Sequence, residues 1–442
     1  MGKENIEKYS FRYSILKSCL RFWHNNVFYR RVIVIGREQI NPDDHLIFAP
    51  NHQNALMDAL AVLFTLKGQP VFLARADIFK KKFIASLLYF LKILPVYRIR
   101  DGYASLKDNN EIFDKTIDVL RNKNGLVILP EGSHEGFRRL RQLKKGICRI
   151  AFQAEEASDF KLNIKIIPVG IEFTHYSRYR QVLTVVYGRP VEVSEFNELY
   201  RKSPEIALNE LRNKLSSEMK RIMVHIDSEE DYEAIDELRS IVNGRFSDKV
   251  RFPKLFRDRI LIEKLNRLKV NDITLFKRIC TLSLQVKEKA KELNIDYRLL
   301  AKKKHPLGWL IAGFAGLIAG LPLFIYGNIF NLTILEIPNF QVRKIKDVQF
   351  RSSLKYGYSL ALAFIVTPIV LILSFVIFSP WWLSILIFLS LPVSGLIAWL
   401  YYLEFNRITG GFRIRNYINS KNTEYLTLNK NHNELISLVA AL

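Results

Sequence analysis

Cysteine is scarce in this chain of 442 residues, and no close set of metal-binding side chains can be found in it. The three cysteines, Cys19, Cys148 and Cys280, are widely spaced, which excludes a disulfide framework and a Cys-x-x-Cys metal site. We interpret these thiols as core residues of a protein in a reducing environment. The eight histidines form no HExxH motif or other close ligand pair. We therefore expect neither a metal centre nor a bound cofactor.

Acidic residues are also few: 43 Asp and Glu stand against 66 Lys and Arg, a formal net charge of +23. Nucleic-acid proteins carry such an excess because it displaces counterions from phosphates, and membrane proteins carry it on their cytoplasmic side. Its location favours the membrane, because residues 249–304 hold 17 basic and six acidic residues and lead into apolar runs. The 49% hydrophobic content excludes a disordered basic protein. We expect a phospholipid membrane as partner and no nucleic acid.

Two long apolar runs lie in the last third of the chain. Residues 356–404 hold a single charge and are long enough for two transmembrane helices with a turn near Ser379-Pro380, because a bilayer core needs about 20 helical residues. Residues 305–335 are interrupted by Gly320-Leu321-Pro322. There we expect a re-entrant or interfacial hairpin, since every basic cluster can then lie on one face of the membrane. A single crossing is the alternative.

Residues 1–31 form a basic amphipathic segment. They lack the continuous apolar stretch of a secretory signal and mix aromatic residues such as Phe11 and Trp23 with basic residues such as Arg12 and Arg21. This pattern is typical of a helix at a membrane surface. A helix packed on the following domain would give the same pattern.

Residues 32–200 alternate short β-branched runs with helical periodicity, the pattern of an α/β domain. The expected strands are Val32–Ile35, Leu46–Ala49, Val71–Ala74, Leu126–Leu129, Ile164–Val169 and Leu183–Tyr187, and the expected helices are Ala55–Leu66, Asn110–Leu120 and Ile147–Ala157. Residues 201–304 then follow a helical period with many charges, which predicts a charged helical region. Residues 405–442 are expected to form a cytoplasmic tail.

The strongest local signal is Asn51-His52-Gln53-Asn54-Ala55-Leu56-Met57-Asp58, directly after an apolar strand. A histidine at a strand end with a carboxylate nearby suits a general base, because the carboxylate orients the ring and stabilises the imidazolium. Positions six apart in one helix lie about 120° off a common face. We therefore expect His52 in a loop and Asp58 in the first turns of a helix, with Asn54 as its cap. A structural histidine is the alternative.

Three further segments combine an apolar stretch or strand with residues that could belong to a site, namely arginine, glutamate, glycine or proline. They are Leu94–Asp101 with Arg98 and Arg100, Leu126–His134 with Glu131 and Gly132 in a turn, and Ile166–Ile171 with Pro168.

In this order, the four segments resemble the four blocks of the glycerolipid acyltransferases, which include glycerol-3-phosphate and lysophosphatidate acyltransferases. The resemblance covers residues 45–190, and four ordered blocks at fitting spacing make it specific. It implies an acyltransferase domain with a central mixed sheet flanked by helices. It also implies transfer of a fatty acyl group from an acyl thioester, acyl-CoA or acyl-carrier protein, to the hydroxyl of glycerol 3-phosphate or 1-acylglycerol 3-phosphate.

The resemblance assigns roles by position. His52 is implied to be the general base on the acceptor hydroxyl and Asp58 the residue that orients it. The residues implied to bind the substrates are Arg98 or Arg100 at the acceptor phosphate, Asn51, Glu131, Gly132 and Ser133 at the acceptor, and Pro168 near the acyl donor. The same resemblance places the enzyme in phospholipid biosynthesis.

Two features depart from the commonest form of these blocks. Five residues rather than four separate His52 from Asp58, and His134 stands where an arginine commonly lies. Both features resemble the fungal-type glycerol-3-phosphate/dihydroxyacetone-phosphate acyltransferase branch, whose chains also continue into C-terminal membrane segments. Either Arg138, Arg139 or Arg141 completes the phosphate site, or these residues form a solvated basic face.

Together these features predict an integral membrane protein with its catalytic domain on the cytoplasmic face. A covalent route is disfavoured because Gly132-Ser133-His134-Glu135-Gly136 lacks the GxSxG nucleophile elbow and Cys148 is expected to be buried on a helix. Two alternatives stay open. One is a non-catalytic basic membrane protein that binds anionic lipid or nucleic acid, and the other is an acyltransferase for a lyso-lipid with another head group.

Overall fold

The chain folds into two compact units in a computed structural model that describes residues 5–96, 105–244, 253–300 and 306–442. One unit comprises Met1–His225 together with Lys346–Ser353, and the other comprises Ile226–Ile345 and Leu354–Leu442. The first unit therefore extends beyond the boundary expected at residue 200. It also includes a short segment from much later in the chain, which the sequence did not predict.

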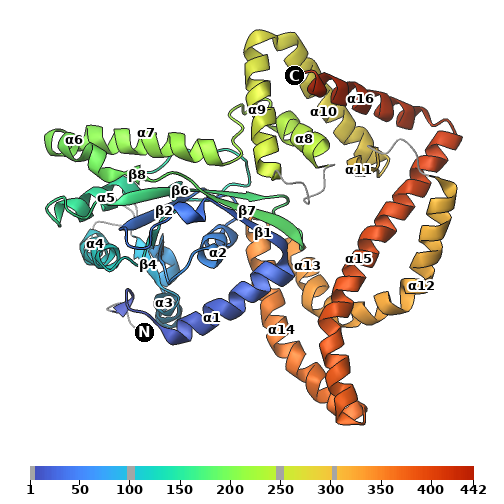
Figure 1. Cartoon of the computed structure of the whole chain (residues 1–442), viewed down its shortest axis with the longest axis horizontal. Helices are drawn as coiled ribbons and strands as arrows, with labels where there is room; N and C mark the ends of the chain where they lie inside the picture. Colours follow the sequence, from blue (N-terminus) through green and yellow to red (C-terminus); the bar gives the residue numbers. More distant parts are fainter. Residues whose placement is uncertain (1–4, 97–104, 245–252, 301–305) are drawn as a thin grey trace. The chain divides into compact units, whose positions relative to one another are not determined.

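The first unit is built on a mixed sheet (Figure 1). Among the described residues its strands follow the order β1-β7-β6-β2-β5-β3-β4, with β8 paired to β6. The bounds are β1 Tyr29–Ile35, β2 Leu46–Pro50, β3 Val71–Arg75, β4 Ile93–Val96, β5 Leu126–Val127, β6 Lys165–Phe173, β7 Gln181–Tyr187 and β8 Val191–Glu192. Strands β2 to β6 are mutually parallel, whereas β7 is antiparallel to β6. The mixed sheet and all six predicted strands are confirmed, and β4 and β8 are additional.

Helices cover both faces of this sheet; Figure 1 shows α7 along one face and α2 along the other. The helices of the unit are α1 Phe11–Phe22, α2 Leu56–Thr65, α3 Lys82–Phe90, α4 Ser105–Arg121, α5 Gly146–Glu156, α6 Asn197–Lys202 and α7 Pro204–Ile222. Every residue of β2 is buried, as expected for a parallel strand covered on both faces. The three predicted helices correspond to α2, α4 and α5.

Helix α7 explains why the unit continues past residue 200. Its inner face buries Leu211, Leu215 and Met219 against the core of the sheet domain. At Gly170 in β6 the helix comes so close that an added Cβ would lie 2.5 Å from the carbonyl oxygen of Ile222. The apolar period of α7 thus belongs to the sheet domain rather than to a separate helical region.

Helix α1 packs on the domain that follows it, which is one of the two arrangements that the sequence left open. Its inner face is packed on the domain, where Lys17 is buried and donates from Nζ to the carbonyl oxygens of Leu66 and Gly68 at 3.0 and 2.7 Å. Its outer face leaves Phe11 and Phe22 exposed. Cys19 is also exposed there, so the expectation that all three cysteines are core residues is wrong for Cys19 and right for the other two.

The second unit is helical. Its helices are α8 Tyr232–Asn243, α9 Lys254–Asn271, α10 Ile273–Glu292, α11 Tyr297–Leu300, α12 Leu307–Asn331, α13 Ile337–Gln341, α14 Phe350–Ile377, α15 Trp381–Asn419 and α16 Thr423–Ala440; the first four residues of α14 belong to the sheet unit. The charged region packs around α10, which buries Phe276, Leu282 and Val286. The expected tail is helical, because α15 continues to Asn419 and α16 packs on α10.

Three described helices are long and apolar enough to cross a membrane: Leu307–Asn328, Phe350–Ile377 and Trp381–Asn419. They support a membrane protein. The turn expected at Gly320-Leu321-Pro322 is absent, because α12 runs through it without interruption. A proline removes one helical hydrogen bond, and the packing of α12 on α15, where Phe324 stacks on Tyr401, holds the helix together. The break predicted at Gly320-Leu321-Pro322 is therefore wrong, whereas re-entry of residues 305–335 into the membrane stays a prediction.

The contact between β6 and α7 predicts a large effect of one methyl group. Gly170→Ala should lower the free energy of unfolding by about 1–3 kcal/mol, because the new Cβ meets a backbone carbonyl that cannot rotate away. Gly146→Ala is the matched control, since a Cβ there meets nothing within 4 Å. Thermal unfolding of both purified variants measures the difference. Equal stability of Gly170→Ala and wild type would contradict this packing.

Candidate active site

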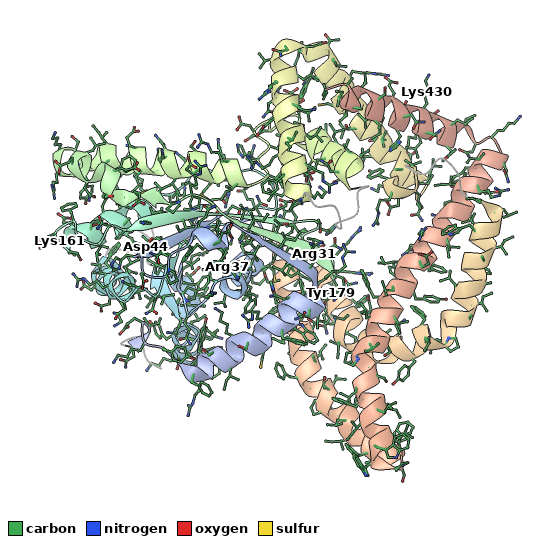
Figure 2. All side chains as sticks on the ribbon, viewed as in Figure 1. Arg31, Arg37, Asp44, Lys161, Tyr179 and Lys430 are labelled. Carbon is green, nitrogen blue, oxygen red and sulfur yellow. The ribbon has the colours of Figure 1, made fainter. Side chains whose placement is uncertain are left out.

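The predicted site residues meet at the carboxyl ends of parallel strands, where open α/β sheets commonly bind ligands. His52 follows β2 and Glu131 follows β5, the strand beside it. The opposite ends of the strands carry a simple ion pair between Asp44 and Lys165, 2.9 Å apart (Figure 2 labels Asp44). The polar residues that need a chemical explanation are thus gathered at one edge.

Asn51 fixes the point at which the chain leaves the sheet. It is fully buried, and its backbone N–H donates to the carbonyl oxygen of Val169 in β6 at 3.2 Å. Its side chain exchanges two hydrogen bonds with the backbone of Ile171, at 3.2 and 2.6 Å. Asn51 therefore pins the loop to β6, and the position of His52 follows from it.

His52 and Asp58 form the expected pair. Nδ1 of His52 lies 2.9 Å from Oδ2 of Asp58; the Asp58 side chain is completely buried and that of His52 is 16% exposed. The same oxygen accepts the backbone N–H groups of Gln53 and Asn54 at 2.8 and 2.6 Å. Asn54 is therefore not the helix cap that the sequence predicted, because the carboxylate of Asp58 binds the loop from inside the helix.

This geometry determines which nitrogen of His52 is available. A carboxylate oxygen accepts hydrogen bonds, so Nδ1 carries the proton and Nε2 carries the lone pair. In the described part of the chain, Nε2 makes no hydrogen bond to protein, and the ring is partly open to solvent. His52 can thus accept a proton from a bound hydroxyl group.

Glu131 joins the third block to the first. Its Oε1 accepts the backbone N–H of His52 at 2.7 Å, and its Oε2 accepts the backbone and Nε groups of Arg141 at 3.2 and 3.1 Å. Burial raises the pKa of Glu131, while these hydrogen bonds and the charge of Arg141 oppose the rise. The turn that contains Glu131 depends on Gly132, whose φ of 75° favours glycine. Glu131 therefore acts as a brace for His52 and Arg141.

Arg141 is the arginine that the structure brings to the site. Its NH1 group donates to the hydroxyl of Ser133 at 2.8 Å and to Glu135 at 3.1 Å. Its NH2 group is buried and has no hydrogen-bond partner among the described residues. A buried guanidinium nitrogen without a partner is suited to an anionic ligand. Arg138 instead pairs with Glu172 in the domain interior, at 2.8 Å.

Pro168 lies inside the sheet, opposite Ala49 of β2. Its carbonyl oxygen accepts the N–H of Gly188 at 2.8 Å, so its nitrogen faces the gap between the β7 and β8 pairings, where no ladder bond is lost. The structure thus places Pro168 one strand from the His52 loop. Arg98 and Arg100, predicted at the acceptor phosphate, lie outside the described residues.

Cys148 is buried on α5, as the sequence predicted. Burial raises the pKa of its thiol to about 12. Only a thiolate is a good nucleophile. The position of Cys148 therefore disfavours a covalent role.

Three contacts of the site were not predicted. The hydroxyl of Tyr176 donates to the Gln53 side chain at 2.8 Å. The His134 ring lies 5.4 Å from the His52 ring, edge to face, and its Nε2 lies 3.0 Å from Oδ2 of Asp347. No local pattern could have revealed Asp347, because 213 positions separate it from His134.

Known proteins share the sheet domain and its blocks. Residues 31–172 match the sequence model of the family described as Acyltransferase. The chain is 26% identical over 152 residues to glycerol-3-phosphate O-acyltransferase 2 of Saccharomyces cerevisiae, which is 34% of this chain and 20% of that protein. It is 26% identical over 170 residues to glycerol-3-phosphate O-acyltransferase 1 of the same yeast, which is 37% of this chain and 21% of that protein. The chain thus spans about a fifth of the length of these yeast relatives.

A bacterial relative is similar over the same part of the chain. The 1-acyl-sn-glycerol-3-phosphate acyltransferase of Borreliella burgdorferi is 27% identical over 165 residues, 36% of this chain and 58% of that protein. The crystal structure of the 1-acyl-sn-glycerophosphate (LPA) acyltransferase PlsC from Thermotoga maritima is similar at 20% identity with a TM-score of 0.30, over 48% of this chain and 79% of that one. The match of residues 31–172 to the Acyltransferase family model confirms the resemblance seen in the sequence.

Proposed function

We propose that this chain is a membrane-bound O-acyltransferase that transfers a fatty acyl group from an acyl thioester to the hydroxyl of glycerol 3-phosphate or 1-acylglycerol 3-phosphate. The observation that carries the proposal is the His52–Asp58 pair, 2.9 Å apart at the carboxyl end of β2, with Nε2 of His52 left unbonded by the described residues. The activities after which the yeast and Borreliella relatives are named support the same reaction class.

The proposed reaction needs one base and no bound cofactor, because a thioester is already activated. Nε2 of His52 removes the proton from the acceptor hydroxyl as the oxygen attacks the thioester carbonyl carbon. The tetrahedral intermediate expels the thiolate, and the proton passes from His52 to the sulfur. Asp58 stabilises the imidazolium between these two steps. Acyl-CoA and acyl-carrier protein both supply such a thioester.

Arg141 supports a phosphate on the acceptor. Its unpartnered NH2 group belongs to a guanidinium that Glu131 and Ser133 already hold in place. Glu131 also binds the backbone of His52, so one carboxylate fixes the base and the cation relative to each other. This brace fits an acceptor that carries a hydroxyl and a phosphate on one short molecule. Arg98 and Arg100 stay predicted partners of the same phosphate.

The sheet unit also constrains how the chain meets the membrane. Lys346–Ser353 folds with Met1–His225, so both segments lie on the same side of the bilayer. An even number of crossings must therefore separate them. In the described part of the intervening chain, only α12 is long and apolar enough to cross. Residues 332–345 are too few for a return span of about 20 residues, and they include Arg343 and Lys344.

The packing of α12 on α15 indicates how deep α12 enters the bilayer. Along the pair, Gly313 faces Ile408, Gly320 faces Tyr401 and Gly327 faces Ser394. Ser394 lies ten residues, or about 15 Å of helix, from Glu404, the charged end of the apolar part of α15. That is about half of a bilayer core. We infer that α12 descends to the middle of the bilayer and that residues 332–345 return to the side it came from.

This re-entrant path places every basic cluster on one side of the membrane. Arg343–Lys346 and Arg407–Arg415 then lie on one side of the membrane, while the turn at Ser379-Pro380 lies on the other. Lys and Arg accumulate on the cytoplasmic side of membranes. We therefore propose that the catalytic domain is cytoplasmic, with α14 and α15 as the two crossings.

The exposed face of α1 supports a second contact with lipid. Phe11, Ile15 and Phe22 are exposed along one side of the helix, and Phe83 and Leu87 are exposed on α3. Apolar side chains of this size next to basic residues such as Arg12 are typical of a helix at a membrane surface. These side chains would thus place the sheet domain in contact with lipid.

The role of His52 predicts a nearly complete loss of activity on its removal. His52→Ala should lower acyl transfer by about 10²–10⁴-fold or more, because no base is left to take the hydroxyl proton. His45→Gln is the matched control, since His45 lies at the other end of β2 and contacts the Leu120 carbonyl. Mass spectrometry of the products from an acceptor panel measures transfer and identifies the acceptor. Undiminished transfer by His52→Ala would refute the proposed mechanism.

The free NH2 group of Arg141 predicts an effect on the acceptor. Arg141→Gln should raise the acceptor KM by about 10- to 100-fold, the loss expected for a charge-assisted hydrogen bond, with a smaller fall in kcat. Arg149→Gln on α5 is the control, because that side chain is half exposed and forms a long ion pair with Glu205, at 3.9 Å. Steady-state kinetics with varied acceptor measure both constants. An acceptor KM unchanged in Arg141→Gln would exclude this contact.

The re-entrant path predicts the sidedness of single cysteines in a Cys19→Ser background. Lys161→Cys, Gln341→Cys and Lys430→Cys should react with an impermeant maleimide from the same side, and Ser379→Cys from the other (Figure 2 labels Lys161 and Lys430). Labelling of intact and inverted vesicles measures this. If Gln341→Cys reacts from the side opposite to Lys161→Cys, α12 is a full crossing and the proposal fails.

A further inference from the structure

One segment of the sheet unit lies much later in the sequence than the rest of that unit. We call Lys346–Ser353 the return segment, because it rejoins the unit that ended at His225. Its contacts fall on the loops around His52. Ser353 accepts the backbone N–H of Leu56, the first residue of α2, at 3.2 Å, and the Ser352 hydroxyl donates to the carbonyl oxygen of Tyr176. The return segment thus touches the loop and helix that carry the base and its carboxylate.

The return segment also fits closely against the loop that carries His134. At Gly136 an added Cβ would collide with the side-chain amide of Gln349. The loop and the return segment are therefore in direct contact at this point, where a larger residue would have to displace the Gln349 side chain. This glycine belongs to the Gly132–Gly136 stretch, which the proposed chemistry does not otherwise explain.

Asp347 is held in a fixed orientation within the return segment. Its Oδ1 accepts the backbone N–H groups of Gln349 and Phe350 at 3.1 and 3.2 Å, at the start of α14. Its Oδ2 lies 3.0 Å from Nε2 of His134. The hydrogen bond from His134 lowers the pKa of Asp347, which keeps the carboxylate charged. One oxygen thus anchors the side chain to the helix while the other binds the histidine.

His134 is therefore fixed next to the base. Its ring lies 5.4 Å from the ring of His52 at an angle of 70°. Since Asp347 accepts at Nε2, the Nδ1 atom of His134 is left to meet a ligand. His134 also occupies the position at which related blocks commonly have an arginine. His134 and Asp347 thus form a second histidine–carboxylate pair beside His52 and Asp58, made through Nε2 rather than Nδ1.

We propose that Asp347 is a positioning residue that holds His134 beside His52, and that His134 so held binds the acceptor. This inference rests on the proposed function and deepens it, because it names His134 as a further residue that binds the acceptor. Asp347 itself touches no reacting atom. Its effect on the reaction passes through the orientation of the His134 ring.

A purely structural role for Asp347 makes a different prediction. The Asp347 side chain is 48% exposed and that of His134 26%, and ion pairs at such exposure contribute little to stability. Loss of the carboxylate should therefore leave the fold intact. A positioning role changes acceptor binding at unchanged stability, whereas a structural role changes stability and every kinetic constant together.

The test compares Asp347→Asn with Asp44→Asn in the full chain. Asp44 is a matched control because it also forms an ion pair, with Lys165 at the opposite edge of the sheet. Asp347→Asn should raise the KM for glycerol 3-phosphate by about tenfold, with kcat within about threefold of wild type and an unchanged Tm. Asp347→Glu should recover part of the loss. His134→Gln should raise the same KM, and the double variant should add little, because the two residues act as one unit.

Three results would overturn the inference. They are an unchanged acceptor KM in Asp347→Asn, a lowered Tm with KM and kcat affected together, or additive effects of the two substitutions. Direct titration of glycerol 3-phosphate onto the wild type and Asp347→Asn separates this inference from the proposed function. Equal binding with normal turnover refutes only the role of Asp347, whereas a wild type that neither binds nor acylates the acceptor refutes both.

Discussion

The carboxylate of Asp58 is the contact on which the arrangement of the site depends. It is completely buried, and one of its oxygens gathers the ring of His52 and the backbone N–H groups of the next two residues. The loop after β2 therefore cannot move without breaking three hydrogen bonds to one buried charge. Glu131 adds a fourth constraint through the backbone of His52. The orientation of the base is thus built into the backbone as well as into the side chain.

The sequence predicted the parts of this fold in which local pattern and tertiary structure agree. Buried parallel strands read as β-branched runs, and His52 and Asp58 lie within one short segment, so both were recognisable. Strand β4 was missed because it is short and contains Pro95, and the Asn54 cap was wrong because the nearby Asp58 carboxylate takes the loop N–H groups. Asp347 was beyond prediction, because nothing in its own neighbourhood depends on His134.

The apolar helices also show where prediction from local sequence patterns fails. Gly320-Leu321-Pro322 is typical of a break, and in water it would interrupt most helices. In α12 it lies where Tyr401 of α15 packs on Gly320, so interhelical contact stabilises a helix that its own sequence disfavours. Glycines at 313, 320 and 327 all face α15. Small residues at this spacing allow close packing of helices, which is the usual source of association in membranes.

The pairing of His134 with Asp347 has a consequence for biogenesis. The two residues are 213 positions apart, so at typical rates of synthesis roughly 10–40 s pass between the appearance of the first and of the second. Helix α12 is synthesised within that interval, because it lies between the two residues in the chain. His52 and Asp58 are only six positions apart and can pair long before His134 has its carboxylate. The His134 loop is therefore secured only after the apolar helix α12 has been made.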